Sequence, residues 1–456
     1  MLQVSQFSIK SLYSLLVTNQ ELKRPPNREE LSSVLRTLFP HLSPCDVSLS
    51  PIRGGRKSAL ALLAQVKPKS YELSRNYLDG DHTRLSAYLR HGVLTLAEVR
   101  DEVLRRVANP HDAGKLINEF AWRDYWQRLY FQIGEGIWKD REPIKTGYRA
   151  SDYATQLGDD ITDGTTTLAC IDGFSHQLKE TGYLHNHARM WLSAYIVHWR
   201  KIRWQAGAEW FLKHLVDGDP ASNNLSWQWV ASTFASKGYI FNRENLERYT
   251  GGAYCRTCPH AQARTCPFDR DYEALELTLF PRLHSADQLT AVPTPPRSFI
   301  PLTASETSAE MTGKPLIWVH TDSLNPDSPM LAAHPDSPAV YIWDTEWLTK
   351  SKITLKRIVF LAECLQEMPG TIELRAGNPA TELLAFAKEC GADYVLAQRT
   401  PDPRLQAAAV AVQRHLPVVW YDPPAFVEST RAFDLKRFSR YWQRAQTSAM
   451  AATHTR

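Results

Sequence analysis

One stretch in the middle of the chain carries most of the information about its fold. Two polar runs are separated by an aromatic pair and followed by two tryptophans: His185-Asn186-His187-Ala188-Arg189-Met190, Trp210-Phe211, Asp217-Gly218-Asp219-Pro220-Ala221-Ser222-Asn223-Asn224 and Ser226-Trp227-Gln228-Trp229. Apolar residues at three- and four-residue spacing around these runs predict helices. Charged and amide side chains in such a helical setting suit the polar edge of a buried ligand. The alternative is an ordinary ion pair between an arginine and an aspartate.

Two segments upstream add further polar groups. The first contains Tyr71, Arg75-Asn76 and the run Thr83-Arg84-Leu85-Ser86, and the second contains Asn118-Glu119 and Trp122-Arg123. The run that starts at Thr83 follows a polar loop and is predicted to begin a helix. Its free N–H groups and hydroxyls could then face a pyrophosphate. Taken alone, this run could also be only a helix cap.

Taken together, the three segments resemble the FAD-binding domain of the photolyase/cryptochrome family. The resemblance implies an all-α domain in which Arg189 and Asp217 pair beside the flavin. It places Asp219 on the polar edge of the flavin and Asn223 near the ring nitrogen that changes protonation. It also implies further cofactor contacts from Tyr71, Thr83, Arg84, Leu85, Ser86, Glu119, Arg123 and Asn186.

The resemblance also implies catalytic residues. Trp227 and Trp204 match two positions of an electron relay, whereas the third position has no clear match and Tyr153 is the nearest aromatic candidate. Asn223 and Glu119 complete the predicted catalytic set. Asparagine at position 223 is the residue usual in photolyases, and this favours repair over light sensing.

A lesion-binding pocket is expected from the same resemblance. Trp122 and Trp229 fall on positions that stack against the lesion, Glu119 and Asn186 on polar contacts to the lesion or adenine, and Met190 on a packing position. On their own, Trp122 and Met190 would be taken for core residues.

Two histidines of the same segment bear on the kind of lesion. His185 and His187 are expected to titrate near neutral pH. Some relatives use a histidine of this segment as an acid on the (6-4) adduct, so the sequence does not choose between that adduct and the cyclobutane dimer.

Four of the seven cysteines form a second candidate site. Cys255, Cys258 and Cys266 have the spacing of metal ligands, and disulfides are not expected in a chain without an export signal. Cys170 matches the distant cysteine of the iron–sulfur bacterial branch of the family, which implies a 4Fe-4S cluster. The interval from Cys258 to Cys266 is shorter than usual there, so a zinc site completed by His260, or a group of reduced thiols, stays open.

Composition bounds the remaining possibilities. The 456 residues carry a net charge of +4, and no run of about 18 apolar residues offers a membrane span. The N-terminus lacks the pattern of a signal peptide, so we expect a cytoplasmic protein without a membrane partner. The chain is predicted to divide into an N-terminal helical extension (1–49), the helical FAD-binding domain (50–280), a linker (281–314), a smaller α/β domain (315–425) and a basic C-terminal tail (426–456).

The α/β domain is predicted from short apolar runs that alternate with helical stretches, as in a Rossmann-like parallel sheet. The run Pro315–Val319 resembles the first strand of the photolyase antenna domain, which comes first in most relatives. Its place after the helical domain resembles a circular permutation. Acidic and polar residues replace the usual arginines after this strand, so no particular antenna chromophore is predicted.

Three functions are compatible with these expectations. The first is light-driven repair of pyrimidine dimers by a DNA lyase, with damaged DNA as partner. The second is a cryptochrome-like blue-light receptor that signals to a protein partner. The third, a light-independent flavin and iron–sulfur redox protein, leaves Trp122 and Trp229 without a role.

Overall fold

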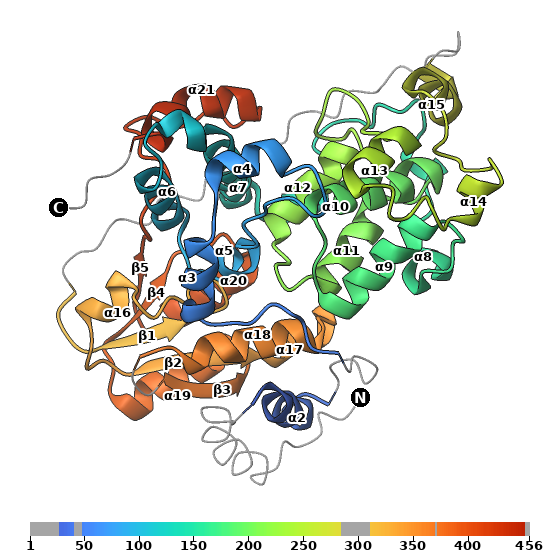
Figure 1. Cartoon of the computed structure of the whole chain (residues 1–456). Coiled ribbons are helices and arrows are strands. Elements are labelled where there is room, and N and C mark those ends of the chain that lie inside the picture. Colours follow the sequence, from blue (N-terminus) through green and yellow to red (C-terminus); the bar gives the residue numbers. More distant parts are fainter. Residues whose placement is uncertain (1–26, 41–47, 284–310, 370–371, 452–456) are drawn as a thin grey trace. The chain divides into compact units, whose positions relative to one another are not determined.

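The computed structural model describes residues 27–40, 48–283, 311–369 and 372–451. These residues form two compact units, and neither unit is one continuous stretch of chain (Figure 1). The sheet unit takes its residues from 1–62, 85–95 and 303–424, and the helical unit takes its residues from 63–84, 96–302 and 425–456. Most of the expected linker, at 284–310, and the first 26 residues of the expected extension lie outside the described residues.

The bounds of the two units differ from the domain bounds predicted from the sequence. Residues 85–95 belong to the sheet unit, and residues 425–451 belong to the helical unit. Residues 85–95 pack with the sheet unit, where the Leu324 N–H donates to the His91 carbonyl (3.0 Å). Residues 425–451 pack with the helical unit, where the Tyr125 hydroxyl donates to the Leu435 carbonyl (2.9 Å).

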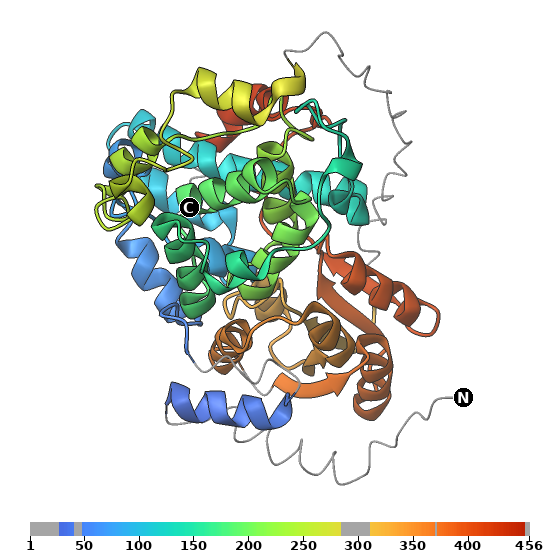
Figure 2. The same ribbon diagram turned by 90° about the vertical axis from the view of Figure 1, so that its right-hand side faces the viewer.

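The helical unit is built around three helices that lie against one another, α10, α11 and α12 (green in Figures 1 and 2). Asp219 caps α12 and Pro220 occupies its first turn, as expected for a helix start. The helices of this unit are α4 (Pro68–Ser74), α6 (Leu96–Arg105), η1 (Pro110–Ala113), α7 (Gly114–Ile133), η2 (Gly134–Trp138), η3 (Ala150–Asp152), α8 (Asp159–Asp163), α9 (Ala169–Thr181), α10 (Asn186–Ala194), the π-helix η4 (Tyr195–Trp199), α11 (Trp204–His214), α12 (Pro220–Val230), α13 (Arg243–Thr250), α14 (Pro259–Gln262), α15 (Tyr272–Leu279), η5 (Pro281–Leu283) and α21 (Phe438–Ala449).

The sheet unit contains five parallel strands in the order β3-β2-β1-β4-β5. Its strands are β1 (Pro315–Val319), β2 (Ala339–Asp344), β3 (Ile372–Gly377), β4 (Tyr394–Gln398) and β5 (Val418–Tyr421). Its helices are α2 (Arg28–Leu38), α5 (Ser86–Arg90), α16 (Pro329–Ala333), α17 (Thr345–Ser351), α18 (Leu355–Gln366), α19 (Pro379–Cys390) and α20 (Pro403–Gln413), and α3 (Arg56–Ala64) begins in this unit. The predicted parallel sheet is therefore confirmed.

The two central strands explain why this sequence folds as a parallel sheet. Every residue of β1 and β2 is buried, as expected for strands covered on both faces. On one face, Leu316 and Val340 pack with residues of α19 and α20 such as Leu383 and Leu405. In such a sheet, the carboxyl ends of β1 and β4 meet where the strand order reverses, a place where ligands commonly bind.

The sequence contains no apolar run long enough to span a membrane, and the helices can be examined for the same property. Within the described ranges, none of the helices combines the length and the apolar character that crossing a membrane requires.

Candidate functional site

Arg189 and Asp217 form the ion pair that the sequence suggested. Arg189 lies on α10, and its Nη2 contacts both carboxylate oxygens of Asp217, at 3.0 and 2.9 Å. Its Nε donates to the Leu184 carbonyl (2.9 Å), so the guanidinium has a fixed orientation. The Asp217 side chain is 3% exposed and that of Arg189 is 25% exposed. One face of the arginine therefore remains accessible.

Asp219 ties α12 to α7. Its Oδ2 accepts hydrogen bonds from Arg123 Nη2 (2.6 Å) and Gln127 Nε2 (2.7 Å), while its Oδ1 accepts from the Ser222 N–H (3.1 Å) at the start of α12. Asn223 is also held, because its Nδ2 donates to the Ala208 carbonyl (3.1 Å). The structure thus fixes Asp217, Asp219 and Asn223 on one short segment.

Three buried polar atoms beside this segment have no hydrogen-bond partner. They are Ser222 Oγ, Asn224 Nδ2 and Trp227 Nε1, all on α12. A buried polar group without a partner costs about 1–3 kcal/mol, so such groups call for an explanation. A polar ligand at the start of α12 provides one, and the donor set is of the kind that would hold a flavin.

Tyr71 and Glu119 lie close to each other in the helical unit. Burial raises the pKa of Tyr71, and the nearby Glu119 carboxylate raises it further. Glu119 also pairs with Lys115 one turn earlier on α7 (2.8 Å).

The segment from Thr83 to Ser86 only partly follows the expectation. Thr83 and Arg84 belong to the helical unit, whereas Leu85 and Ser86 belong to the sheet unit. Helix α5 begins only at Ser86, spans five residues and has no side-chain cap at its N-terminus. Because one turn of helix aligns few peptide dipoles, the expected anion-binding helix start is weaker than predicted.

The pKa values of His185 and His187 differ from the expectation. His185 and His187 pack within a cluster that includes His82, whose ring centroid lies 4.2 Å from that of His185. Burial, followed by the neighbouring His82 and His187, lowers the pKa of His185 to about 3. Burial and then Arg75 lower the pKa of His187 to about 4. The expectation that these histidines titrate near neutral pH was wrong, because both are buried among positive or titratable neighbours.

An aromatic cavity of about 660 Å³ brings together Trp122 and Trp229, the two predicted lesion-stacking residues. Its other lining residues are Tyr125, Trp126, Lys145, Phe234, Ala235, Ser236, Lys237, Gly238, Tyr239, Ile240, Tyr272, Glu276, Phe280, Leu283, Arg437, Phe438 and Ser439. Asn186 and Met190 are not among them. Those two residues contact each other instead, with Asn186 Nδ2 at 3.4 Å from the Met190 sulfur.

One face of Trp122 is covered by a residue that the sequence did not single out. Phe438, at the start of α21, stacks on Trp122 with ring centroids 3.7 Å apart and planes within 9°. Helix α21 is anchored nearby, because the Tyr441 hydroxyl lies 2.6 Å from Asp124 Oδ2 and Arg437 pairs with Glu142. No local sequence signal connects residues so far apart in the chain.

Trp227 and Trp204, the two tryptophans predicted to form an electron relay, are both buried. Trp227 packs against Gly207 of α11, three residues from Trp204. The ring of Trp204 is stacked with that of Trp138, at 6.5 Å and 11°. Tyr153, the aromatic candidate from the sequence, instead bonds to the Thr146 hydroxyl (2.8 Å).

The four cysteines of the candidate metal site, Cys170, Cys255, Cys258 and Cys266, all belong to the helical unit. Burial, then the neighbouring Cys255, Cys266 and Cys258, raises the pKa of the Cys170 thiol. Across the described ranges, however, no three histidine, cysteine, aspartate or glutamate side chains form a group able to hold a metal ion. His260 uses both ring nitrogens on hydroxyls, those of Thr167 (2.8 Å) and Thr265 (3.0 Å), which argues against the zinc alternative.

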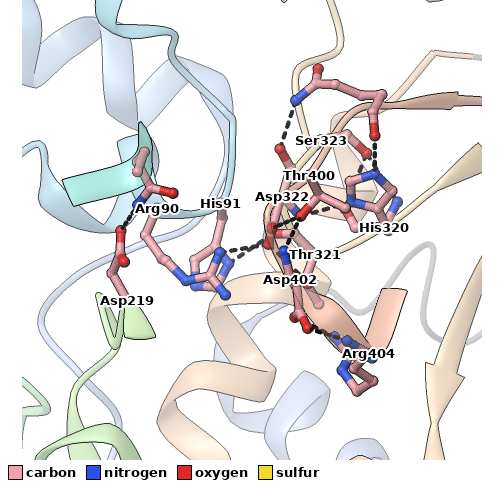
Figure 3. A network of polar contacts seen from close by, with 12 residues as sticks. Arg90, His91, Asp219, His320, Thr321, Asp322, Ser323, Thr400, Asp402 and Arg404 are labelled. Carbon is pink, nitrogen blue, oxygen red and sulfur yellow. Dashed lines mark hydrogen bonds and ion pairs between the residues drawn. The ribbon is translucent and has the colours of Figure 1, made fainter. Parts of the chain in front are cut away.

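In the sheet unit, the place where the strand order reverses is filled by polar side chains (Figure 3). Asp322, just after β1, accepts hydrogen bonds from Arg90 of α5 (2.5 Å) and from Thr400 Oγ1 after β4 (2.6 Å). His320 Nε2 bonds to the Gln398 carbonyl (2.8 Å). Burial by itself would raise the pKa of Asp322, but the Arg90 guanidinium and other neighbours lower it. The adjoining hollow holds only about 10 Å³, close to the space of one water molecule.

The comparisons with known proteins agree with the geometry of the helical unit. Residues 116–255 match the family described as the FAD binding domain of DNA photolyase. The deoxyribodipyrimidine photo-lyase of Alkalihalophilus pseudofirmus is 32% identical over 215 residues, which cover 45% of this chain and 43% of that protein. The photo-lyase of Streptomyces griseus is 31% identical over 195 residues, covering 41% and 42% of the two chains.

Solved structures give a looser match. The bacterial class III photolyase of Agrobacterium tumefaciens aligns over 49% of each chain at 26% identity, with a TM-score of 0.39. The chain spans less than half the length of the two curated relatives named above.

The part of the helical unit that contains the Arg189–Asp217 and Arg123–Asp219 ion pairs thus lies within the segment that resembles the FAD binding domain of DNA photolyase. This likeness to the FAD binding domain of DNA photolyases is carried by residues 116–255 of the chain.

Proposed function

We propose that this chain repairs ultraviolet-induced pyrimidine dimers in DNA, in a light-driven reaction that uses the FAD of the helical unit. The observation that carries the proposal is the aromatic cavity shared by Trp122 and Trp229. Flat indole walls suit bases that have been turned out of a duplex, and damaged bases cost less to extrude than intact ones. The exposed Lys237 at the cavity adds positive charge for a phosphate backbone.

The residues at the start of α12 would hold the flavin for this reaction. When bound in its reduced form, FAD supplies the photoexcited electron that opens the dimer. Arg189, fixed by Asp217, would present a positive charge of constant orientation, and Asp219 would keep Arg123 aligned. The Nδ2 atom of Asn223 is engaged by Ala208, which directs its Oδ1 atom to serve a ring N–H. Electrostatic groups that are already in place need no rearrangement during the reaction.

Glu119, Asn186 and Met190 are the remaining residues proposed to contact the lesion or the adenine. Asn186 and Met190 lie on one turn of α10, and Glu119 lies on α7 one turn before Arg123. Asn186 is exposed, and Glu119 and Met190 are partly buried, so all three side chains are accessible to a bound base.

The repair proposal is tested on the protein with its flavin bound and reduced. The holoprotein is mixed with ultraviolet-damaged single- and double-stranded DNA, in light and in darkness, and both dimer types are quantified by chromatography. We expect light-dependent loss of one lesion, strongly reduced by Trp229→Ala and unchanged by Trp199→Phe, which alters a tryptophan outside the cavity. No loss of either lesion with flavin fully bound would overturn the proposal.

One observation favours the second candidate, a cryptochrome-like receptor for blue light. Phe438 already occupies the face of Trp122 on which a base could stack, and it belongs to a separate basic helix, α21. In a receptor, flavin photochemistry would alter this contact and expose α21 to a protein partner. Illumination should then increase proteolytic cleavage within α21 without any lesion repair.

We propose that the four cysteines hold a 4Fe-4S cluster. Cys170 comes from α9, Cys255 and Cys258 precede α14 and Cys266 follows it, and four thiols are the ligand set of such a cluster. Cluster formation would require the thiols to draw closer and lose their protons, since burial raises the pKa of Cys255 to about 11. Anaerobically purified protein should contain about four iron and four sulfide ions per chain, and Cys170→Ser should lose them. Zinc without sulfide would overturn the assignment.

The sheet unit is proposed to be the antenna-type domain, placed after residues 50–280 by circular permutation. We further propose that no chromophore binds where the strand order of this unit reverses, because the Asp322 network fills that place and leaves a hollow of only about 10 Å³. The action spectrum of the reaction should then follow the absorption of the flavin alone. An additional band that is absent from the flavin spectrum would contradict this.

A further inference from the structure

The C-terminal helix α21 carries a surface that the proposed reaction does not yet use. We infer that α21 is a docking surface for single-stranded DNA, on which a base stacks against Trp442 while Arg440 and Arg444 contact phosphates. The inference rests on the proposed function and deepens it, because it names the form of DNA that the chain takes up. Three features carry it: the packing of α21, its aromatic rings and its charge.

Helix α21 is held firmly against α7 (Figure 1). Its buried residues, Tyr441, Ala445 and Ala449, share one side of the helix. Tyr441 is fully buried, and its hydroxyl donates to Asp124 Oδ2 (2.6 Å). The exposed side of α21 is therefore already in a fixed position, and a ligand that binds there has little chain to order.

Three parallel rings run from the aromatic cavity along α21. Phe438 stacks on Trp122, and both residues line the cavity. Trp442 follows one turn later, with its ring centroid 6.1 Å from that of Phe438 and the planes within 9°. Trp442 is partly exposed, and among the described residues its ring contacts no aromatic ring other than Phe438. Every base has a flat face that can stack on such an indole, whatever its sequence.

The positive charge of α21 is not balanced within the helix. Its sequence contains Arg440 and Arg444 but no aspartate or glutamate. Arg440 pairs with Asp434 (3.0 Å), and at least half of each side chain is exposed. Such a pair contributes little stability, so a phosphate can replace the carboxylate. Arg444 is exposed and donates to the Ala432 carbonyl, which uses only part of its guanidinium. An open depression of about 500 Å³ is lined by Asp434, Arg440, Gln443 and Arg444.

Helix α13 of the same unit shows how an ordinary solvated face differs. There Arg243 pairs with Glu247 (3.0 Å) and Arg248 with Glu244 (3.1 Å), each four residues away on the same helix. The arginines of α13 are thus neutralised by the helix that carries them. Helix α21 has no such partners of its own, so its surface attracts a polyanion.

The combination of a ring with arginines selects single strands over duplexes. Phosphates alone would attract both forms of DNA to the arginines. Stacking on Trp442 requires a base whose face is uncovered, whereas a duplex covers both faces of its internal bases. The first residues of α21, Phe438 and Ser439, line the aromatic cavity. A strand held along α21 therefore has a neighbouring base at the cavity.

The test measures binding of undamaged DNA in darkness, so that it does not depend on flavin chemistry. Fluorescence anisotropy gives the affinity of the full-length protein for a labelled single-stranded oligonucleotide and for the same sequence as a duplex. We expect the parent to prefer the single strand. Trp442→Ala should weaken single-strand binding about fivefold or more and change duplex binding less than about twofold. Trp442→Phe keeps a ring and should restore most of the affinity.

The salt dependence of single-strand binding tests the arginines separately. Each phosphate contact contributes about 0.7 to the slope of log affinity against log salt concentration. Arg444→Gln should therefore reduce the slope by about 0.7, and Arg440→Gln combined with it by about 1.4. Arg248→Gln on α13 is the matched control and should leave the slope unchanged.

Two results would overturn the docking surface. One is an equal loss of single-strand and duplex binding in Trp442→Ala, and the other is an unchanged salt slope when both arginines of α21 are replaced. The expected binding pattern without light-driven repair of damaged DNA would instead overturn the proposed function and leave the docking surface in place.

Discussion

The polar groups after β1 in the sheet unit and those on α12 in the helical unit are satisfied to different degrees. In the sheet unit, Asp322 satisfies Arg90 and Thr400, and the remaining hollow is about the size of one water molecule. In the helical unit, Arg189 keeps an accessible face and three polar atoms on α12 are left without partners. The sheet unit thus fills the place where parallel sheets commonly bind ligands, while α12 of the helical unit keeps buried polar groups without a protein partner.

We infer from this contrast that the cofactor binds in the helical unit. The polar network of the sheet unit would then contribute to folding stability. The same kind of substitution should therefore have different consequences in the two units: loss of folding stability in one and loss of the cofactor in the other.

The largest effect on stability is expected for Asp322→Ala. The change leaves the Arg90 charge buried without its partner, and breaking a buried pair in this way costs about 3–5 kcal/mol. The sheet unit should unfold at lower urea concentration, whereas flavin content per folded chain should stay at the parent level. Asp327→Ala, which removes a 68% exposed aspartate from Arg56, is the matched control and should change little. Equal stability of the two variants would show that the network is not a structural element.

Asp217→Asn should show the reverse pattern. The asparagine keeps the shape of the side chain but loses its charge, so the cost in stability is about 1–3 kcal/mol. Flavin binding should fall sharply because Arg189 is no longer held by its carboxylate. Equilibrium dialysis with FAD and urea unfolding, both on the same preparation, separate the two effects. Retained flavin affinity would place the cofactor away from this pair.

The sequence predicted the framework well because its signals are local. The parallel sheet was predicted from short apolar runs, of which Pro315–Val319 coincides with β1, and the pair of Arg189 with Asp217 was predicted from the family resemblance. Other features depend on tertiary packing. Residues 85–95 join the sheet unit through Arg90, and Phe438 reaches Trp122 from the far end of the chain. No periodicity or motif encodes such contacts.

The acid response should also distinguish the buried histidines from ordinary ones. An unfolded histidine has a pKa near 6.5, whereas the pKa of His187 in the helical unit is about 4. Between these values the unfolded state binds the extra proton, so the free energy of unfolding falls as the pH falls. The loss is about 1.4 kcal/mol per pH unit for each such histidine. Urea unfolding at several pH values between 7 and 5 should give a shallower slope for His187→Gln, and parallel slopes would contradict the assigned pKa.

The smallest effect on stability, and the most informative about function, is expected for Phe438→Leu. Leucine keeps apolar contact with Trp122 but removes the ring stack, which is worth about 0.5–1.5 kcal/mol. If a base must stack on this face of Trp122, the variant should bind ultraviolet-damaged DNA more tightly than the parent and repair it faster. Phe433→Leu, which alters the contact of Arg128 with a ring that precedes α21 and does not line the cavity, is the control. Unchanged affinity would mean that the lesion stacks on Trp229 and not on this face of Trp122. The contact between Phe438 and Trp122 would then only help to pack α21 against the helical unit.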